Sequence, residues 1–259
     1  EPAGHQREIL SPRRPFRVVS LFTGAGGMDY GFEAAGLETV VAIEMDHDAC
    51  ETLRANRHFP VLERRIETVL RKEILSAAGI REDQVDLLIG GPPCQPFSKS
   101  AYWAAGDTRR LKDPRARTLA EYMRCVEELK PKVFVLENVH GLGYEGKDEG
   151  LKLLIRLTES LNRRVGTDYR ISTKLINSVE FGVPQTRQRL FLVAHREGRD
   201  FRFPEPTHRR PDRAETPARP SDRGLLEAAT AWDAIGESGG NGGEDLRVSG
   251  FWADLAREN

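Results

Sequence analysis

The chain has 259 residues, 39% of them hydrophobic and 31% charged, which is the balance of an ordinary globular protein with one large domain. No apolar run approaches the roughly 20 residues that cross a bilayer, so no membrane span is expected. The formal net charge of −1 argues against a chain that serves mainly as a nucleic-acid platform, because duplex affinity comes largely from Lys and Arg.

Short apolar runs alternate with segments of helical periodicity through most of the chain. The expected strands are Val18–Phe22, Val40–Glu44, Val85–Ile89, Val133–Glu137 and Leu190–Ala194. The expected helices are Met28–Ala35, Asp48–Arg57, Ala116–Glu128 and Gly150–Asn162. This alternation predicts an α/β fold with a doubly wound, mostly parallel Rossmann-like sheet and helices on both faces. In such folds the site lies at the carboxyl ends of the strands.

Composition divides the chain into three parts. Residues 1–15 form a polar N-terminal extension, and residues 16–203 carry the strand–helix alternation of the main domain. Residues 204–259 read as an irregular Pro- and Gly-rich tail in which Leu225–Ile235 is expected to form one short helix. The sequence does not begin with Met, which indicates a trimmed or processed chain.

A glycine-rich turn follows the first expected strand and leads into a helix. Gly24, Gly26 and Gly27 would let the backbone turn sharply and approach a ligand closely. Glu44 follows twenty positions after Gly24 at the end of the second strand, where a carboxylate can accept both ribose hydroxyls. The third glycine of a dinucleotide fingerprint is absent, since Asp29 stands there. An adenosine-containing ligand without a pyrophosphate grip is favoured over a purely structural turn, and Asp46 is expected to cap the next helix.

The three cysteines show neither metal-ligand spacing nor a disulfide framework, so we expect a reducing compartment and no metal site. Cys50 and Cys125 lie within helical patterns and read as core residues. Cys94 differs, because Pro92 and Pro93 precede it in a loop at a strand's carboxyl end. A thiol there is a candidate nucleophile, provided that positive charge or helix amides lower its pKa.

Two further motifs lie at strand ends. Glu137-Asn138 ends the fourth expected strand, and Glu137 is either a structural anchor or an acid whose pKa is raised by burial. Arg187 and Arg189 precede the fifth strand and would point to one face of an extended segment. They could bind a carbonyl oxygen and a phosphate, or form a surface salt bridge.

Together, in this order, these strings resemble the cytosine-5 DNA methyltransferase family over residues 18–194. The resemblance implies a methyltransferase that uses S-adenosylmethionine, releases S-adenosylhomocysteine and acts on double-stranded DNA. The implied catalytic residues are Cys94, Glu137, Asn138, Arg187 and Arg189. The implied cofactor-binding residues are Phe22, Thr23, Gly24, Ala25, Gly26, Gly27, Glu44, Met45, Ile66 and Pro93.

The family's chemistry accounts for these residue types. The Cys94 thiolate adds to C6 of cytosine and makes C5 nucleophilic, while Glu137 holds N3 and the amino group. Arg189 near O2 adds electrostatic stabilisation. The target base must leave the duplex, and the loop from Ser98 to Asp113 is expected to cover it. A bacterial restriction–modification or related system and a cytoplasmic, nucleoid-associated location follow from the same resemblance.

The sequence departs from the family pattern in several places. Arg65 stands where an acidic residue usually contacts adenine, Thr118 replaces a leucine, and Ala101 replaces a glycine. The family's variable target-recognition region and its last two motifs are not found after Ala194. We therefore expect either a fragment or one subunit of a split enzyme whose partner supplies target recognition. Two alternatives stay open: methylation of tRNA cytosine by the same chemistry, and a non-catalytic subunit that keeps the fold.

Overall fold

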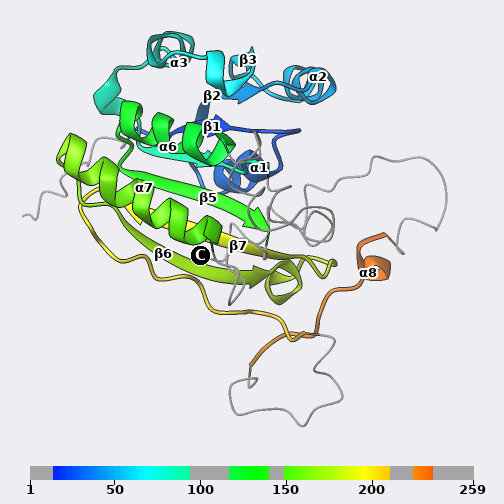
Figure 1. Ribbon diagram of the computed structural model, residues 1–259. Helices are drawn as coiled ribbons and strands as arrows, with labels where there is room; N and C mark the ends of the chain where they lie inside the picture. The colour runs from blue at the N-terminus through cyan, green and yellow to red at the C-terminus, as the bar shows by residue number, and fades with distance from the viewer. Residues whose placement is uncertain (1–13, 94–116, 140–148, 211–223, 236–259) are drawn as a thin grey trace, which may run out of the picture.

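The computed structural model describes residues 14–93, 117–139, 149–210 and 224–235. A seven-stranded sheet in the order β3-β2-β1-β4-β5-β7-β6 runs through the molecule (Figure 1). Its strands are β1 (Arg17–Leu21), β2 (Glu38–Glu44), β3 (Val61–Glu63), β4 (Leu87–Gly90), β5 (Val133–Val139), β6 (Arg170–Asn177) and β7 (Gln188–His195). The helices are α1 (Gly27–Ala34), α2 (His47–Asn56), α3 (Arg71–Ala78), α6 (Arg117–Leu129), α7 (Glu149–Val165) and α8 (Ala231–Ile235). Within these ranges, no helix is long and apolar enough to cross a membrane.

The sheet is mostly parallel, as expected, with one reversal. Strands β1 to β5 pair in parallel, and β7 then pairs antiparallel with both β5 and β6. Because β7 runs backwards, its first residues lie beside the last residues of β5: Val139 pairs with Arg189, and Val133 pairs with His195. Residues that precede β7 are therefore brought to the carboxyl edge of the parallel strands.

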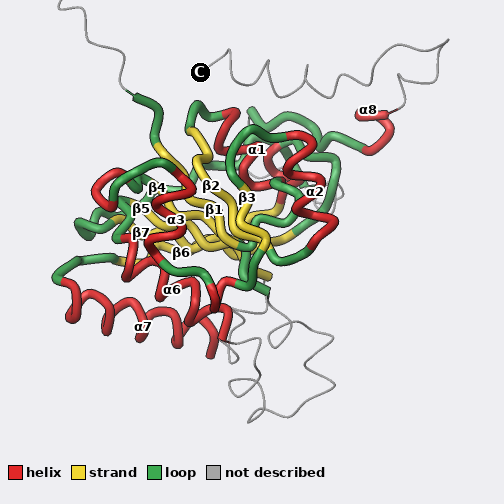
Figure 2. Tube along the Cα trace, turned by 90° about the horizontal axis from the view of Figure 1, so that it is seen from above, coloured by secondary structure: helices red, strands yellow, loops and turns green. Residues whose placement is uncertain are grey.

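Side chains of each central strand alternate between two apolar layers, as the pleat of a strand requires. In β5, Phe134 and Leu136 join the large core with buried residues of α3, α6 and α7. Val135, between them, joins a smaller core against Met28 and Phe32 of α1 on the opposite face. Figure 2 shows α6 and α7 on one side of the strands and α1 on the other. Glu137 continues the alternation of Val135 and so belongs to the α1 face.

The nine strands and helices expected between residues 16 and 203 are all present, eight of them within two residues of their expected bounds and α7 within three. Among the described residues, the sequence missed three strands and helices, namely β3, α3 and β6. β3 has three residues, too few to show a period, and α3 buries Ile74 alone. Only Asn177 of β6 is buried, so this edge strand lacks an apolar run.

The expectation of a helix over Leu225–Ile235 is wrong in its first half, because α8 begins at Ala231. Leu226 forms an isolated parallel bridge with His208. Its backbone N–H donates to the carbonyl oxygen of Thr207 at 2.9 Å, and its carbonyl oxygen accepts from the N–H of Arg209 at 2.7 Å. These partners hold the backbone in an extended conformation that excludes a helix there.

A buried ion pair network fastens the amino edge of the sheet. The Asp86 side chain, 2% exposed, lies 2.6 Å from Arg14 and 2.7 Å from Lys132. The backbone N–H of Arg17 also donates to it at 3.0 Å. Burial alone would raise the pKa of Asp86, but these hydrogen bonds outweigh it and hold the pKa below its usual range. The residue ties β1, β4 and the start of β5 together.

Replacement of Asp86 by alanine should destabilise the fold by about 2–4 kcal/mol at neutral pH, because charged and backbone donors lose their buried acceptor. The pKa of this carboxyl is lower in the folded state, so its stabilisation is present at neutral pH and is lost as pH falls below about 4. Urea unfolding at several pH values measures both effects. The difference in the free energy of unfolding between wild type and D86A should become smaller in acid. Asp168→Asn, which breaks an exposed pair with Arg170, is the control and should change little. A gap that is the same at acid and neutral pH would contradict the assignment.

Candidate functional site

A pocket of about 680 Å³ opens at the carboxyl edge of the sheet, on the face covered by α1. Its size is that of a pocket for a drug-sized ligand, about 300–1,000 Å³. The described residues that line it come from the end of β1 and the turn after it, the start of α1, the ends of β4 and β5, and the segments around β6 and β7. They are Ser20, Leu21, Phe22, Thr23, Gly27, Met28, Asp29, Gly90, Gly91, Glu137, Ile176, Ser178, Phe181, Arg187, Arg189, Phe191 and Pro204.

Sheet register explains why residues so distant in sequence share this pocket. Glu137 pairs with Phe191 across β5 and β7, and Arg189 pairs with Ile176 across β7 and β6. Directly paired residues project from the same face of a sheet, as do residues two apart in one strand. Glu137, Phe191, Arg189 and Ile176 are therefore on one face by register alone.

Glu137 and Arg189 form an ion pair inside the pocket. Arg189 Nε lies 2.8 Å from Glu137 Oε1, and the two side chains are 23% and 22% exposed. Burial raises the pKa of Glu137 above its ordinary value, although the charges of Arg189 and Arg187 act in the opposite direction. A carboxyl with a raised pKa is suited to donate a hydrogen bond as well as to accept one.

The turn that carries Arg187 is fixed by the end of β6. The side-chain oxygen of Asn177 accepts from the backbone N–H of Arg187 at 3.0 Å. The backbone N–H of Ser178 donates to the carbonyl oxygen of Arg187 at 3.0 Å. The Ser178 hydroxyl donates to the carbonyl oxygen of Gln185 at 2.6 Å. Arg187 itself is exposed at the pocket mouth. Its backbone is thus held while its guanidinium remains accessible.

Asn138 points to the other face from Glu137 and is 2% exposed. Its amide nitrogen donates to the carbonyl oxygen of Pro92 at 3.1 Å, which joins the end of β5 to the segment that follows β4. Pro92 is buried and Pro93 is exposed. Cys94 comes next in the chain and lies outside the described residues, as does the expected cover from Ser98 to Asp113.

The glycine-rich turn after β1 is held against the end of β2 by one carboxylate. Glu44 Oε2 accepts from the backbone N–H of Gly24 at 2.7 Å. Glu44 Oε1 accepts from the backbone N–H groups of Met45 and Asp46 at 2.8 and 2.9 Å. Phe22 has a φ of 52°, an uncommon conformation for a residue with a side chain, and lines the pocket. The turn is therefore closely specified before any ligand contact.

Two glycines near this turn have a structural reason, one in its backbone conformation and the other in close packing. A Cβ at Gly26, whose φ is +86°, would lie 2.9 Å from Cδ2 of Leu53 in α2. A Cβ at Gly90 would lie 2.8 Å from the carbonyl oxygen of Leu21 and 2.9 Å from the ring of Tyr122. The buried Tyr122 hydroxyl in turn donates to the carbonyl oxygens of Val135 at 2.8 Å and Leu88 at 3.2 Å. β1, β4 and β5 consequently approach closely beneath the pocket.

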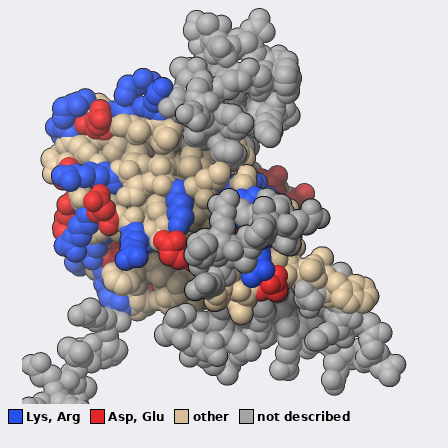
Figure 3. Space-filling model, turned by 90° about the horizontal axis from the view of Figure 1, so that it is seen from below, with Lys and Arg blue, Asp and Glu red and all other residues tan. Residues whose placement is uncertain are grey.

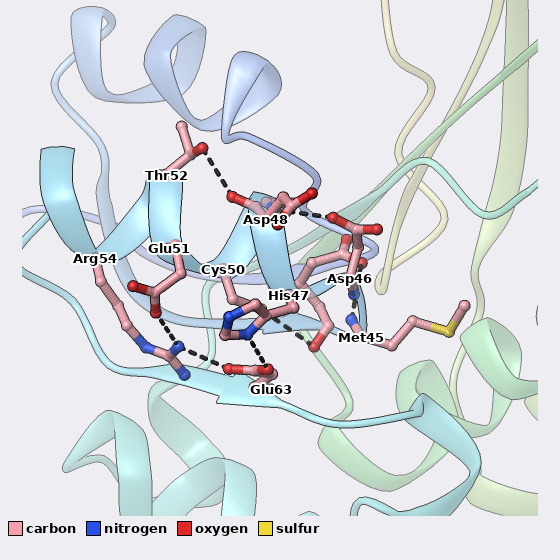
Figure 4. Close-up of polar contacts among 11 residues, drawn as sticks. Met45, Asp46, His47, Asp48, Cys50, Glu51, Thr52, Arg54 and Glu63 are labelled. Carbon is pink, nitrogen blue, oxygen red and sulfur yellow. Dashed lines mark hydrogen bonds and ion pairs between the residues drawn. The ribbon is translucent and has the colours of Figure 1, made fainter.

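The expected cap of α2 is confirmed. The Asp46 carboxylate accepts from the backbone N–H of Ala49 at 2.9 Å (Figure 4). Below it in Figure 4, His47, Glu51 and Glu63 have ligand-type atoms within 4.8 Å of one another. Arg54 already binds Glu51 at 2.9 Å and Glu63 at 2.6 Å. This cation between the carboxylates makes the group an exposed charge network, and we assign no metal to it.

Only part of the expected cofactor set lines the pocket. Phe22, Thr23 and Gly27 do so together with the expected catalytic residues Glu137, Arg187 and Arg189. The other expected cofactor residues are not among the described lining residues: Gly24, Ala25, Gly26, Glu44, Met45, Ile66 and Pro93. Met45 is 63% exposed, whereas Ile66 is 5% exposed within the large core. Cys50 and Cys125 are confirmed as core residues, both at 0%.

Several lining residues had no functional signal in the sequence. Ile176, Phe181, Phe191 and Pro204 read as ordinary strand or loop residues, yet they form the apolar wall of the pocket. The Asn177-Ser178 pair, which is typical of a turn, could have indicated that the chain after β6 folds back toward Arg187. Asp29 was noted only as a missing glycine, although it lies beneath the glycine-rich turn.

Comparisons with known proteins agree on one family. The family model described as C-5 cytosine-specific DNA methylase matches residues 16–241. The chain is similar to the Type II methyltransferase M.AquIA of Picosynechococcus sp., with 43% identity over 74% of this chain and 77% of that protein. It is also similar to M.SacI of Streptomyces achromogenes, with 39% identity over 74% of this chain but only 50% of that protein.

Solved structures show the same fold. A prophage-encoded E. coli protein assigned as a DNA modification methyltransferase matches with a TM-score of 0.60 and 25% identity, over 85% of this chain and 54% of that chain. The Dnmt2 methyltransferase of S. pombe matches with a TM-score of 0.52 and 21% identity, over 73% of this chain and 52% of that chain. The chain spans about half the length of most of these proteins.

Replacement of Arg189 by methionine should raise the pKa of Glu137 further, because it removes both the nearest positive charge and a hydrogen bond to the carboxylate. Arg187→Met removes only a weaker charge effect and should raise this pKa by less. Titration of the Glu137 side-chain carboxyl carbon by NMR measures both shifts. Equal shifts in the two variants, or a fall in R189M, would contradict the geometry of this ion pair.

Proposed function

The chain belongs to the C-5 cytosine-specific DNA methylase family, and on this premise we propose that it transfers a methyl group from S-adenosylmethionine to C5 of cytosine in DNA through a covalent bond between Cys94 and C6. One observation carries the proposal. A single pocket brings the turn residues Phe22 and Thr23 together with Glu137, Arg187 and Arg189. A methyl donor and a cytosine ring need adjoining places of this kind.

The residues of the turn fit an adenosyl cofactor. A Cβ built on Gly24 or Gly27 would meet nothing within 4 Å, so the backbone there borders open space rather than packed neighbours. A ligand can approach such bare backbone closely. Phe22 offers an apolar ring beside that space, and Glu44 lies at the end of β2 where a carboxylate can receive ribose hydroxyls. When bound, S-adenosylmethionine supplies a methyl group carried on a positively charged sulfur.

Residues of this chain activate the target cytosine for methyl transfer. Cys94, as a thiolate, adds to C6 and turns C5 into an enamine-like nucleophile. Glu137 holds N3 and the exocyclic amino group, and its raised pKa supports a protonated carboxyl that donates to N3. Arg189 lies next to Glu137 and stabilises charge at O2, a contribution that commonly amounts to about 10²–10³ in rate. Once C5 carries the methyl group, its proton passes to a base, the C–H electron pair re-forms the C5–C6 double bond, and the Cys94–C6 bond breaks to return the thiolate.

Asn138 and Arg187 have supporting places in this proposal. Asn138 holds the carbonyl oxygen of Pro92, two residues before Cys94, and so fixes the start of the loop that carries the nucleophile. Arg187 is exposed at the mouth of the pocket with its backbone held by Asn177. A guanidinium in that position can bind a DNA phosphate beside the flipped base.

Double-stranded DNA is the proposed substrate. Its binding requires protein surface in addition to the face that is shown in Figure 3. On the face seen in Figure 3, Lys and Arg side chains are mixed with Asp and Glu rather than joined into one basic patch. Arg124 pairs with Glu121 and Glu128, and Arg164 pairs with Glu127. Cations that are already paired contribute little to phosphate binding. We propose that target recognition comes from a further segment or a second subunit, as part of a restriction–modification system.

Cys94→Ala should abolish methyl transfer to DNA, with a loss of at least about a thousandfold, because no other group supplies the C6 nucleophile. Tritiated S-adenosylmethionine with duplex DNA measures the transfer, in the presence of any separate chain or segment that carries target recognition. Cys50→Ala, which alters a buried thiol of α2, is the matched control and should keep most of the activity. Unchanged transfer in C94A would refute the mechanism.

A duplex with 5-fluorocytosine at the target position should trap wild-type protein as a covalent adduct, because the C5 fluorine cannot leave as a proton would. Denaturing electrophoresis detects the adduct, which C94A should not form. An adduct with tRNA instead of DNA would reassign the substrate. Wild-type protein that forms no adduct with either acceptor would favour a non-catalytic subunit.

A further inference from the structure

A buried carboxylate lies directly beneath the glycine-rich turn and takes no part in the proposed chemistry. Asp29, in the first turn of α1, is 0% exposed. Its Oδ2 accepts from the Ser20 hydroxyl of β1 at 3.0 Å, and its Oδ1 accepts from the Thr39 hydroxyl of β2 at 3.0 Å. A buried carboxylate is costly unless its hydrogen bonds are satisfied, so this arrangement is closely specified.

One of the two hydroxyl partners continues to the turn. The Thr23 hydroxyl donates to the Ser20 oxygen at 3.0 Å, which completes a chain from Thr23 through Ser20 to Asp29. Thr39 has no such continuation among the bonds of this network: it joins Asp29 to β2. Two hydrogen-bonded branches, here called arms, therefore start from the carboxylate. One runs through Ser20 to Thr23 in the turn, and the other runs to Thr39 in the sheet.

The direction of the hydrogen bonds along this arm is set by Asp29. An ionised carboxylate only accepts, so the Ser20 hydroxyl must donate to it and its oxygen is left to receive the Thr23 hydroxyl. Burial raises the pKa of Asp29, while the hydrogen bonds from Thr39 and Ser20 act in the opposite direction and favour the charged form. With the acceptor removed, Ser20 is free to reverse, and the Thr23 hydroxyl is left with its longer contact of 3.5 Å to the carbonyl oxygen of Ile43.

All three residues of this network line the pocket, and Thr23 is the most accessible of them. Thr23 is 9% exposed, whereas Ser20 and Asp29 are 1% and 0% exposed. A ligand in the pocket therefore reaches Thr23 more readily than the two residues behind it. Thr23 also follows Phe22, whose φ of 52° must be maintained by its surroundings.

We propose that Asp29 is a positioning residue for the cofactor, acting through the Ser20 hydroxyl on Thr23 and thereby on the turn that receives the adenosyl group. This inference rests on the proposed use of S-adenosylmethionine. It assigns to Asp29 a contribution to cofactor affinity that is separate from its contribution to the stability of the sheet.

The test compares variants of the two arms in the full chain. Calorimetric titration with S-adenosylhomocysteine gives the affinity, and thermal melting without ligand gives the stability. Ser20→Ala cuts the arm toward Thr23 and should weaken affinity about tenfold, the effect of one well-placed hydrogen bond. Thr39→Val removes the other hydroxyl from the same carboxylate. It should lower the melting temperature and leave the affinity within about twofold.

Two substitutions of Asp29 complete the test, and one of them forms a double-mutant cycle with Ser20→Ala. Asp29→Leu removes the acceptor and should weaken affinity about tenfold, with no further loss when Ser20→Ala is already present. Asp29→Asn keeps one side-chain oxygen that can face Ser20, while its amide faces the Thr39 oxygen. It should therefore retain most of the affinity.

The outcomes separate the inference from the proposed function. Wild-type protein that binds no S-adenosylhomocysteine would refute the proposed cofactor and this inference with it. If wild-type protein binds S-adenosylhomocysteine and S20A binds it with the same affinity, the inference alone is refuted. The same holds if S20A and T39V lose affinity equally. Additive losses for S20A and D29L would also refute it, because two residues of one relay cannot act independently.

Discussion

The reversal of β7 is the constraint on which the site depends. Strands β1 to β5 are parallel, so their carboxyl ends share one edge, and a sixth parallel strand would have placed its preceding residues at the opposite edge. Because β7 is inserted antiparallel between β5 and β6, Arg187 and Arg189 arrive beside Glu137 instead. The hairpin of β6 and β7 supplies this reversal, and Asn177 fixes the turn between its strands through the backbone of Arg187. The pocket is thus a consequence of topology before it is one of side chains.

Much of this arrangement could be predicted from the sequence. The apolar runs located five strands, and the period of two correctly placed Arg187 and Arg189 on one face of the chain. The direction of β7 could not be derived in the same way, since an apolar run such as Leu190–Ala194 is the same in either direction. β6 escaped detection because its edge position leaves only Asn177 buried. Leu226 was misassigned because its backbone partners, Thr207 and Arg209, are visible only in three dimensions.

Two carboxylates at opposite edges of the sheet show how local partners decide the role of one chemical group. Asp86 receives two cations and a backbone N–H, and these partners lower its pKa despite burial. Among the described residues, Glu137 has one direct ion-pair partner, Arg189, while Arg187 stays exposed at the pocket mouth, and burial then dominates so that the pKa rises. The first arrangement stabilises a charged form and holds strands together; the second leaves a group that can change its protonation state. The sequence offered a raised pKa for Glu137 as one of two alternatives, whereas it gave no indication of the role of Asp86.

Asp29 differs from both Asp86 and Glu137 in the chemistry of its hydrogen-bond partners, which are hydroxyl groups rather than cations. Hydroxyl groups can donate or accept, so the carboxylate of Asp29 determines the direction of the bonds through Ser20 rather than only neutralising charge. A guanidinium partner, as at Asp86, could not transmit such a direction, since it only donates. The turn after β1 is consequently held from two sides: Glu44 accepts from the backbone of Gly24, and the relay from Asp29 accepts from the side chain of Thr23. A turn that meets its ligand with bare backbone needs such supports from behind, because the glycines that expose the backbone contribute no packing of their own.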